Sequence, residues 1–217
     1  MIRRGRLAPL PDRRRPPKPH YRGKRVLDLT MVAIVAPPAA VLGACCALAI
    51  RLTGRGPVIF RQQRVGLQGQ RFTLLKFRTM IDGDNPVFPD ETRITWVGRI
   101  LRRTSLDELP QLVNVARGQM SIVGPRPTLA YQVERYTDRQ RGRLSVRPGV
   151  TGLAQVQGRN ALRWAERIEF DLAYIETQSL RTDLSLIARS VRSAASGEGT
   201  DGHPEDDPLA RSAEDAA

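Results

Sequence analysis

An uncharged apolar run from Leu29 to Ile50 constrains this chain more than any other feature of its sequence. The run is long enough for a helix to cross the hydrocarbon core of a bilayer, which takes about 20 residues. Pro37 and Pro38 lie at its centre, where missing N–H donors and ring clashes should break or sharply kink a helix. Basic residues flank both ends, and such flanks tend to stay cytoplasmic. The run therefore favours a re-entrant membrane helix-hairpin over residues 24–51.

Three other structures fit the same run. It matches a straight transmembrane helix if the prolines are tolerated, and a buried core helix if the protein is soluble. A cleaved secretory signal fits less well, because the run is long, starts late and is followed by more basic residues. A bend at membrane depth also requires other protein groups to cover the backbone atoms that the prolines release.

The charge is large and unevenly placed. A formal net charge of +13 points to an anionic partner: nucleic acid, lipid headgroups or a phosphorylated substrate. The first residues are strongly basic and the last are strongly acidic, and neither end can bury apolar surface. We therefore predict a basic disordered arm at 1–23, a folded domain at 52–195 and an acidic disordered tail at 196–217.

The cysteines and histidines suggest no site. Cys45 and Cys46 are neighbours inside the apolar run, so they cannot join distant segments, and they are expected to act as small hydrophobic side chains. This is compatible with a reducing compartment. His20 and His203 fall in the two charged ends, and neither receives a role.

Beyond the apolar run, the pattern predicts a small α/β domain that is mainly helical. Two β-rich runs, at 58–63 and 71–77, flank a glycine-bearing turn and predict a β-hairpin. Helices are expected from Trp96 and from Ser105, whose hydroxyl would cap the second helix. Residues 164–191 show helical spacing of apolar side chains, which either pack inward or form interfacial amphipathic helices on the membrane.

Two consecutive carboxylates, Asp107 and Glu108, are the central catalytic candidates. One can attack a phosphorus atom as a nucleophile while the other holds a divalent cation. Consecutive side chains on a helix point about 100° apart, so separate roles are expected rather than joint ligation of one ion. The same residues would also suit an ordinary acidic helix N-terminus.

Basic side chains are the second theme, because guanidinium groups match phosphate oxygens and several stand beside Gly or Pro. A solvated basic surface is the plain alternative for each one. There is no P-loop, dinucleotide fingerprint or zinc-ligand spacing. The candidates for substrate or phosphate binding are Lys76, Arg78, Arg102, Arg126, Arg147 and Arg159.

Six ordered blocks together resemble the bacterial sugar transferase family, the monotopic polyprenyl-phosphate phosphoglycosyl transferases, in its short form. The resemblance runs from about Lys24 to Val191. The blocks are KRVLD (24–28), GPVIFRQ (56–62), KFRTM (76–80), RRTSLDELPQ (102–111), MSIVGPRP (120–127) and RPGVTGLAQVQGR (147–159).

The resemblance implies a reaction with two half-steps. Asp107 would attack the β-phosphate of a UDP-sugar and release UMP, and polyprenyl phosphate would then take the phosphosugar, which initiates assembly of a membrane-linked glycan. Glu108 would bind Mg²⁺, and Arg102, Arg126 and Arg159 would hold phosphates or sugar. It also implies a catalytic domain on the cytoplasmic face of the cytoplasmic membrane, contacts with membrane lipid, no nucleic acid partner, and compatibility with a homo-oligomer.

The sequence departs from the family pattern at the membrane bend. The family has a Ser-Pro pair there, whereas this chain has Ala36-Pro37-Pro38, so a hydrogen bond that could support the bend is missing. Two rival functions stay open from the residues themselves. One is a membrane-anchored basic binding protein without catalysis, and the other is a glycosyltransferase that retains no phosphate and releases UDP.

Overall fold

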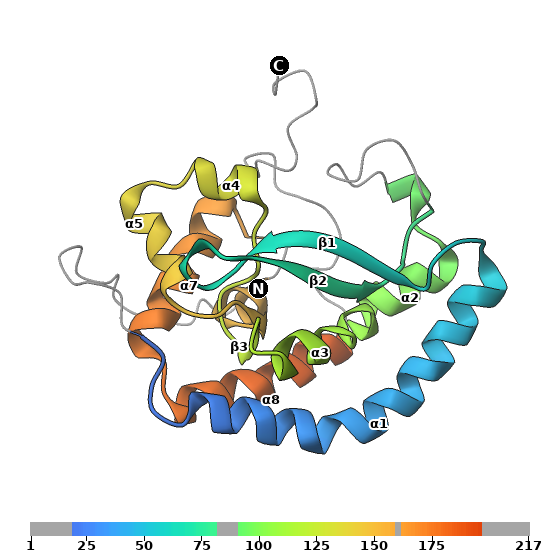
Figure 1. The fold of residues 1–217 in the computed structure, drawn as a ribbon, viewed down its shortest axis with the longest axis horizontal. Coiled ribbons are helices and arrows are strands. Elements are labelled where there is room, and N and C mark those ends of the chain that lie inside the picture. Colours follow the sequence, from blue (N-terminus) through green and yellow to red (C-terminus); the bar gives the residue numbers. More distant parts are fainter. Residues whose placement is uncertain (1–18, 82–90, 159–161, 197–217) are drawn as a thin grey trace.

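The computed structural model describes residues 19–81, 91–158 and 162–196. One long apolar helix, α1, runs along one side of a mainly helical domain that contains two small β-sheets (Figure 1). The elements are α1 (Lys24–Thr53), β1 (Ile59–Val65), β2 (Arg71–Phe77), α2 (Trp96–Arg103), α3 (Gln111–Ala116), β3 (Ser121–Val123), α4 (Ala130–Glu134), α5 (Asp138–Arg141), β4 (Gly149–Thr151), α6 (Leu153–Gln157), α7 (Trp164–Thr177) and α8 (Leu180–Ser196). Short 3-10 turns occupy Leu67–Gly69, Glu91–Arg93, Leu106–Glu108 and Gly142–Ser145.

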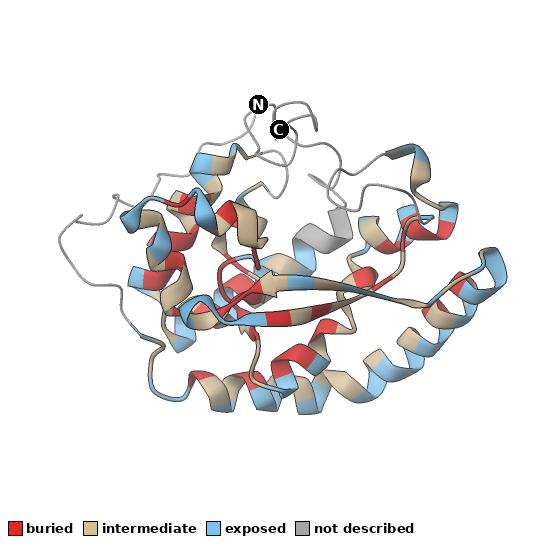
Figure 2. Cartoon of the chain, turned by 45° about the horizontal axis from the view of Figure 1, so that its top comes forward, coloured by how far each residue is buried: buried red, intermediate tan, exposed pale blue. Residues whose placement is uncertain are grey.

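Helix α1 continues through both prolines instead of ending at them. Pro37 and Pro38 cannot donate to the carbonyls of Ala33 and Ile34, so two of its backbone hydrogen bonds are lost at mid-helix. Figure 1 shows that the helix curves in this middle part, and Figure 2 shows the same curve from another side. The prolines thus bend the helix without breaking it, so α1 is one curved helix instead of two separate ones.

Little of α1 is covered by protein. Among the described residues it alone is long and apolar enough to cross a membrane, and only 11% of its most apolar window is buried. Its outer face is exposed (Figure 2), and the exposed large apolar side chains there are Val26, Leu29, Ile34, Val41, Leu42, Leu48 and Leu52. A core helix of a soluble protein would be buried on most sides, so α1 does not have that role.

The predicted β-hairpin is present. Strands β1 and β2 pair antiparallel from Ile59 opposite Phe77 to Val65 opposite Arg71. A second, parallel pair joins β3 to β4, with Ser121 opposite Gly149. This pair brings the GPRP and RPG blocks together, although they are more than twenty residues apart in the sequence.

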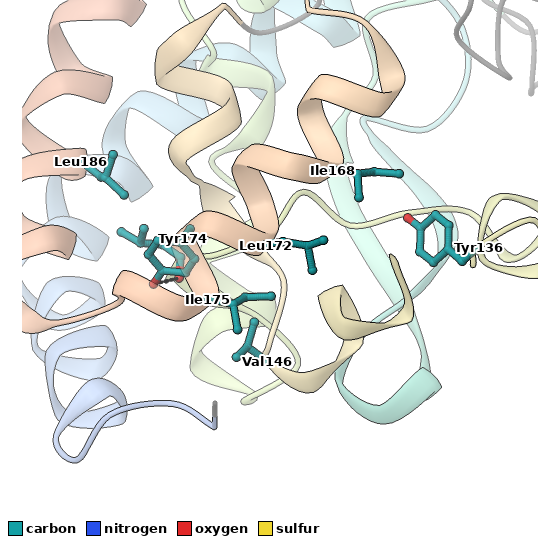
Figure 3. Close-up of a cluster of buried hydrophobic side chains, with 8 residues drawn as sticks. Tyr136, Val146, Ile168, Leu172, Tyr174, Ile175 and Leu186 are labelled. Atoms are coloured by element: carbon teal, nitrogen blue, oxygen red, sulfur yellow. Dashed lines mark hydrogen bonds between the residues drawn. The ribbon is translucent and has the colours of Figure 1, made fainter. Parts of the chain in front are cut away.

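The main core lies beneath α7, where its apolar face meets β3, the 142–146 segment and α8 (Figure 3). Ile168, Leu172 and Ile175, three or four residues apart, are all buried there. The helical prediction for 164–191 is therefore right, but the segment forms two helices, because Gln178 and Ser179 between α7 and α8 are not helical. The inward-packing alternative holds for α7.

Both ends of α1 pack on the same domain. Near its C-terminus, Cys46 and Ile50 join Phe77 of β2 and Val97 and Leu101 of α2 in a second cluster. At its N-terminus, the buried Lys24 ammonium lies 2.7 Å from Asp183 Oδ2 of α8 and 3.3 Å from Asp28 Oδ1 of α1 itself.

The expected cap at Ser105 is wrong. Ser105 adopts a left-handed backbone conformation (φ 58°), and its side chain makes no cap hydrogen bond. The chain instead turns sharply after α2, forms the 3-10 turn Leu106–Glu108 and begins α3 at Gln111. The actual cap of this region is Thr95, whose side chain accepts a 2.9 Å hydrogen bond from Gly98 N–H at the start of α2.

Candidate active site

The carboxylate pair stands on the 3-10 turn between α2 and α3. Leu106 and Leu109, on either side of it, pack against the cluster formed by α1, α2 and β2. These leucines fix the turn to the core while the two intervening side chains face the β-hairpin. In the LDEL sequence the two leucines therefore pack into the apolar cluster, and this places the two acids beside the C-terminal end of α1.

A single ammonium contacts both acids. Lys76 Nζ of β2 lies 2.8 Å from Glu108 Oε1 and 3.5 Å from Asp107 Oδ2. The pair lies on a 3-10 turn instead of an α-helix, and both carboxylates reach this one cation. Their negative charge is concentrated at a point where a cation is favoured.

Burial and neighbouring charges act in opposite directions on the pKa of Asp107. The residue is only 7% exposed, and burial raises the pKa of its carboxyl above the usual value. The Lys76 charge opposes this shift, the neighbouring Glu108 adds to it, and Arg102 and Arg126 oppose it more weakly. A buried carboxylate of this kind is poorly solvated when ionised, which makes it a more reactive nucleophile than an exposed aspartate.

Two of the predicted arginines join the pair. Arg126 Nη1 lies 3.5 Å from Glu108 Oε1, and its side chain is 46% exposed, so the guanidinium is open to an incoming anion. Arg102 of α2 donates from Nε to Thr79 Oγ1 at 3.0 Å, and its charge lies close enough to lower the pKa of Asp107. Lys76, Arg102 and Arg126 thus surround the acids from three separate elements.

The loop that carries Arg126 is fixed by close backbone contacts. Gly124 N–H donates to Thr151 O at 2.8 Å, and Gly149 N–H donates to Pro125 O at 2.8 Å. A Cβ atom on Gly149 would lie 2.1 Å from Gly124 N, so a side chain cannot be accommodated there. The glycines of the GPRP and RPG blocks allow the two main chains to touch just before Arg126.

The other predicted basic residues are placed elsewhere. Arg78 donates to the carbonyls of Arg55 and Gly54, which fastens the end of α1 to β2. Arg147 Nε donates to Gly118 O at 2.7 Å, and its backbone N–H donates to His20 Nε2 at 2.8 Å. Arg159 lies outside the described residues. Pro37 and Pro38 lie in the bend of α1, away from the carboxylate pair in sequence and element.

The donor set fits Mg²⁺ if a substrate completes it. Among the described residues, no group of three or more His, Cys, Asp or Glu side chains could enclose a metal ion. Mg²⁺, however, is commonly held by one or two carboxylates together with water and substrate phosphates. Asp107 and Glu108 supply hard oxygen ligands of that kind, and both already contact a cation, the Lys76 ammonium.

Sequence reasoning missed several residues around this site. Thr79 accepts a hydrogen bond from Arg102, and Arg64 of β1 lies close enough to Arg126 and Glu108 for their charges to affect its pKa. Arg143, nearly fully buried, donates to the carbonyl of Arg126. Because Arg64 and Arg143 are ordinary basic residues in their local sequence, only their tertiary contacts identify them.

Comparison with known proteins gives a family match and several similar relatives. The family model described as bacterial sugar transferase matches residues 20–197. The chain is 42% identical over 179 residues to the "Uncharacterized sugar transferase EpsL" of Bacillus subtilis, covering 81% of this chain and 89% of that relative. It is 46% identical over 183 residues to the "UDP-glucose:undecaprenyl-phosphate glucose-1-phosphate transferase" of Caulobacter vibrioides, covering 78% and 68%.

A longer relative matches over a smaller share of its length. The "Undecaprenyl-phosphate galactose phosphotransferase" of Salmonella typhimurium is 36% identical over 193 residues, which is 78% of this chain and 40% of that protein. The family match includes α1, the β-hairpin, the carboxylate turn and the Arg126 loop. The chain therefore belongs to the bacterial sugar transferase family.

Proposed function

We propose that this enzyme is a polyprenyl-phosphate hexose-1-phosphate transferase that takes the sugar-1-phosphate from a UDP-sugar and releases UMP. The observation that carries the proposal is the convergence of Asp107, Glu108, Lys76 and Arg126 at one point. Relatives at 46% and 36% identity are named for glucose-1-phosphate and galactose phosphate transfer to undecaprenyl phosphate. Both names give undecaprenyl phosphate as the acceptor, and we propose undecaprenyl or decaprenyl phosphate as the acceptor of this enzyme.

In the first half-reaction, an Asp107 oxygen attacks the β-phosphorus of the donor. A carboxylate–phosphorus bond forms, the bond from that phosphorus to the bridging oxygen breaks, and the bridging oxygen leaves with UMP. The sugar-phosphate is then held on Asp107. The buried setting of Asp107 and the nearby Lys76, which favours its ionised form, prepare the nucleophile.

In the second half-reaction, a phosphate oxygen of polyprenyl phosphate attacks the same phosphorus. The bond to Asp107 breaks, so the carboxylate is regenerated and the product is a polyprenyl diphosphate sugar. Arg126 and Arg102 stabilise the negative charge that develops on the phosphoryl oxygens. Glu108 would hold Mg²⁺, which when bound neutralises the diphosphate and assists departure of UMP.

We also propose that α1 enters the cytoplasmic leaflet and returns to the same side. A straight helix of 30 residues would be about 45 Å long, so its ends would lie on opposite sides of a bilayer. Here Lys24 at one end and Ile50 near the other contact the same domain. The curve at the prolines and the basic residues at both flanks support the same placement (Figure 1).

Exposed apolar side chains on α2 and α8 extend this membrane-facing surface. Trp96 and Ile100 of α2 and Leu180, Leu184 and Val191 of α8 are exposed. Figure 1 shows α8 running beside α1 along the same side of the molecule. Amphipathic helices with exposed apolar residues and flanking arginines are suited to the headgroup region, so we propose that α2 and α8 lie at the membrane interface.

The catalytic proposal is tested by product analysis with the full chain in nanodiscs. With a panel of UDP-hexoses, Mg²⁺ and undecaprenyl phosphate, we expect UMP to be released, and Asp107→Asn to abolish release. Asp138→Asn, an exposed aspartate at the start of α5, is the matched control and should retain activity. Release of UDP instead of UMP would contradict the proposal and favour a phosphate-free glycosyl transfer.

The covalent step has a test of its own. Without polyprenyl phosphate, wild type should release about one UMP per active enzyme in a burst and retain the β-phosphorus label of the donor. A requirement for the lipid acceptor before any UMP appears would rule out the aspartyl intermediate.

Membrane placement is tested by labelling single cysteines at Arg22 and Arg55, both exposed, in a cysteine-free variant. A membrane-impermeant reagent should reach both positions from the cytoplasmic side. Labelling from opposite sides would show a straight crossing.

A further inference from the structure

The main chain at Arg126 is held by two other guanidinium groups. Arg143 Nη2 donates to the carbonyl oxygen of Arg126 at 3.2 Å. Arg64 Nη1 donates to the next carbonyl oxygen, that of Pro127, also at 3.2 Å. Since the proline at 127 also restricts the backbone on that side, two successive peptide groups are fixed in orientation. The direction in which the Arg126 side chain leaves the loop depends on that orientation.

Arg143 is itself rigidly held. It is 5% exposed, its Nη2 lies 2.5 Å from Asp171 Oδ2 of α7, and its Nη1 donates to the Tyr136 hydroxyl. Its guanidinium carbon also lies 5.6 Å from the centre of the Tyr136 ring and 5.8 Å from that of Trp164. The hydrogen bonds and the two rings therefore fix the position and orientation of the Arg143 guanidinium, so it can hold the loop in place.

Arg64 is fixed from the β-hairpin. Its Nε and Nη2 donate to Gln62 Oε1 at 3.1 and 2.6 Å, and the adjacent Val65 N–H donates to Thr128 O at 2.9 Å. Burial, together with the nearby Arg126 charge, lowers the pKa of Arg64 to about 10. The Arg64 and Arg126 guanidinium groups thus lie close enough for their charges to interact, and an anion bound at Arg126 would offset their repulsion.

Packing alone does not account for these anchors. Arg143 Nε and Asp171 Oδ1 are buried and have no hydrogen-bond partner among the described residues. A shallow recess, partly open to solvent, lies beside the loop and is lined by Val65, Gly66, Arg126, Arg143 and Pro148 among others. A buried ion pair with unpaired polar atoms is a poor source of stability, so stability alone does not explain why Arg143 and Asp171 are buried beside the loop.

We propose that Arg64 and Arg143 are positioning residues, which hold the loop so that the Arg126 guanidinium lies over Glu108 and meets the donor diphosphate. The inference rests on the proposed transferase function, and it extends that function to two residues outside the carboxylate cluster. Neither residue needs to touch the substrate. Their effect passes through the carbonyls of Arg126 and Pro127.

The test is a double-mutant cycle with Arg126. Arg143→Lys and Arg64→Lys keep the charge but lose the planar fork that reaches several acceptors at once. Each should lower kcat/KM for the UDP-sugar by about tenfold to about 100-fold, because a misplacement of about 1 Å can cost that much. The loss should be seen mainly as a higher KM for the donor. Arg61→Lys, an exposed arginine on the same strand, is the matched control and should change kcat/KM by less than about twofold.

The decisive comparison uses the Arg126→Ala background. If the anchors act through Arg126, adding Arg143→Lys or Arg64→Lys to Arg126→Ala should cause almost no further loss of kcat/KM. Losses that multiply in the double variants would overturn the proposal, as would single variants that behave like Arg61→Lys. If Arg143→Lys does not fold, the same comparison is made with Arg64→Lys alone. UMP release by wild type is measured in the same experiment, so a failure of the proposed reaction is seen separately.

Discussion

The buried contact between α1 and α8 makes a quantitative prediction about stability. Lys24, Asp28 and Asp183 are 2%, 1% and 0% exposed, and the Lys24 ammonium is shared between the two carboxylates. Lys24→Met keeps the length of the side chain but removes the charge, which leaves two buried acids without their cation. Breaking a buried ion pair in this way costs about 3–5 kcal/mol.

This loss is large enough to measure by thermal unfolding. For a chain of this size, 1 kcal/mol corresponds to about 2–4 °C in Tm, so Lys24→Met should lower Tm by about 6–20 °C. The assay is unfolding in detergent micelles, followed by circular dichroism. Arg51→Met, at the exposed opposite end of α1, has only a 3.4 Å hydrogen bond to Gly56 O and should lie within about 0.5 kcal/mol of wild type.

A double variant separates the charge effect from lost packing. Asp183→Asn removes one of the two acids that Lys24→Met would leave unpaired, so the double variant should be more stable than the sum of the single losses predicts, by at least about 1 kcal/mol. Additive losses, or a Lys24→Met protein with the Tm of wild type, would refute the reasoning that this cluster fastens the membrane helix to the domain.

Three further predictions follow from single contacts. A Cβ on Gly98 would lie 2.0 Å from Thr79 O, so Gly98→Ala should displace α2 and lower both Tm and UMP release; a protein with normal values would contradict the close approach. Burial lowers the pKa of His20, and its Nε2 must be unprotonated to accept the hydrogen bond from Arg147 N–H. The contribution of His20 to stability is therefore complete above pH 6.5 and is lost as the pH falls through the lowered pKa. His20→Gln should flatten the pH dependence of Tm between pH 7 and 5, and an unchanged slope would count against it. Burial raises the pKa of Asp107, so its ionised form destabilises the folded state at pH values above the unfolded pKa of about 3.9. Asp107→Asn removes that charge, and the inactive variant should therefore unfold at an equal or higher temperature than wild type at pH 7.5. A clear fall in Tm would contradict this.

The sequence was sufficient for the features that depend on local pattern. An uncharged run of membrane length identified α1, and two β-rich runs around a glycine-bearing turn identified the β-hairpin. The spacing of apolar residues identified the buried face of α7. The carboxylate pair and Arg126 were selected through ordered blocks that resemble a known family, and the structure places Arg126 beside Glu108.

Tertiary structure decided what each residue does. Ser105 looks like a helix cap in sequence but adopts a left-handed turn, because the chain must reverse after α2. Arg78 and Arg147 were phosphate-binding candidates like Arg126, yet they donate to main-chain carbonyls, whereas Arg126 reaches Glu108.

Asp107 and Glu108 are a further case, because their local sequence would also suit an ordinary acidic helix N-terminus. By itself the sequence determined that two acids stand together between leucines and that an apolar helix precedes them. Only the fold brought Lys76 from β2 within reach of both acids and set the two ends of α1 on one domain. The physical reason is that helix and strand patterns depend on neighbours a few residues away, whereas the pKa of a carboxyl and the direction of a guanidinium depend on charges and carbonyls from distant segments.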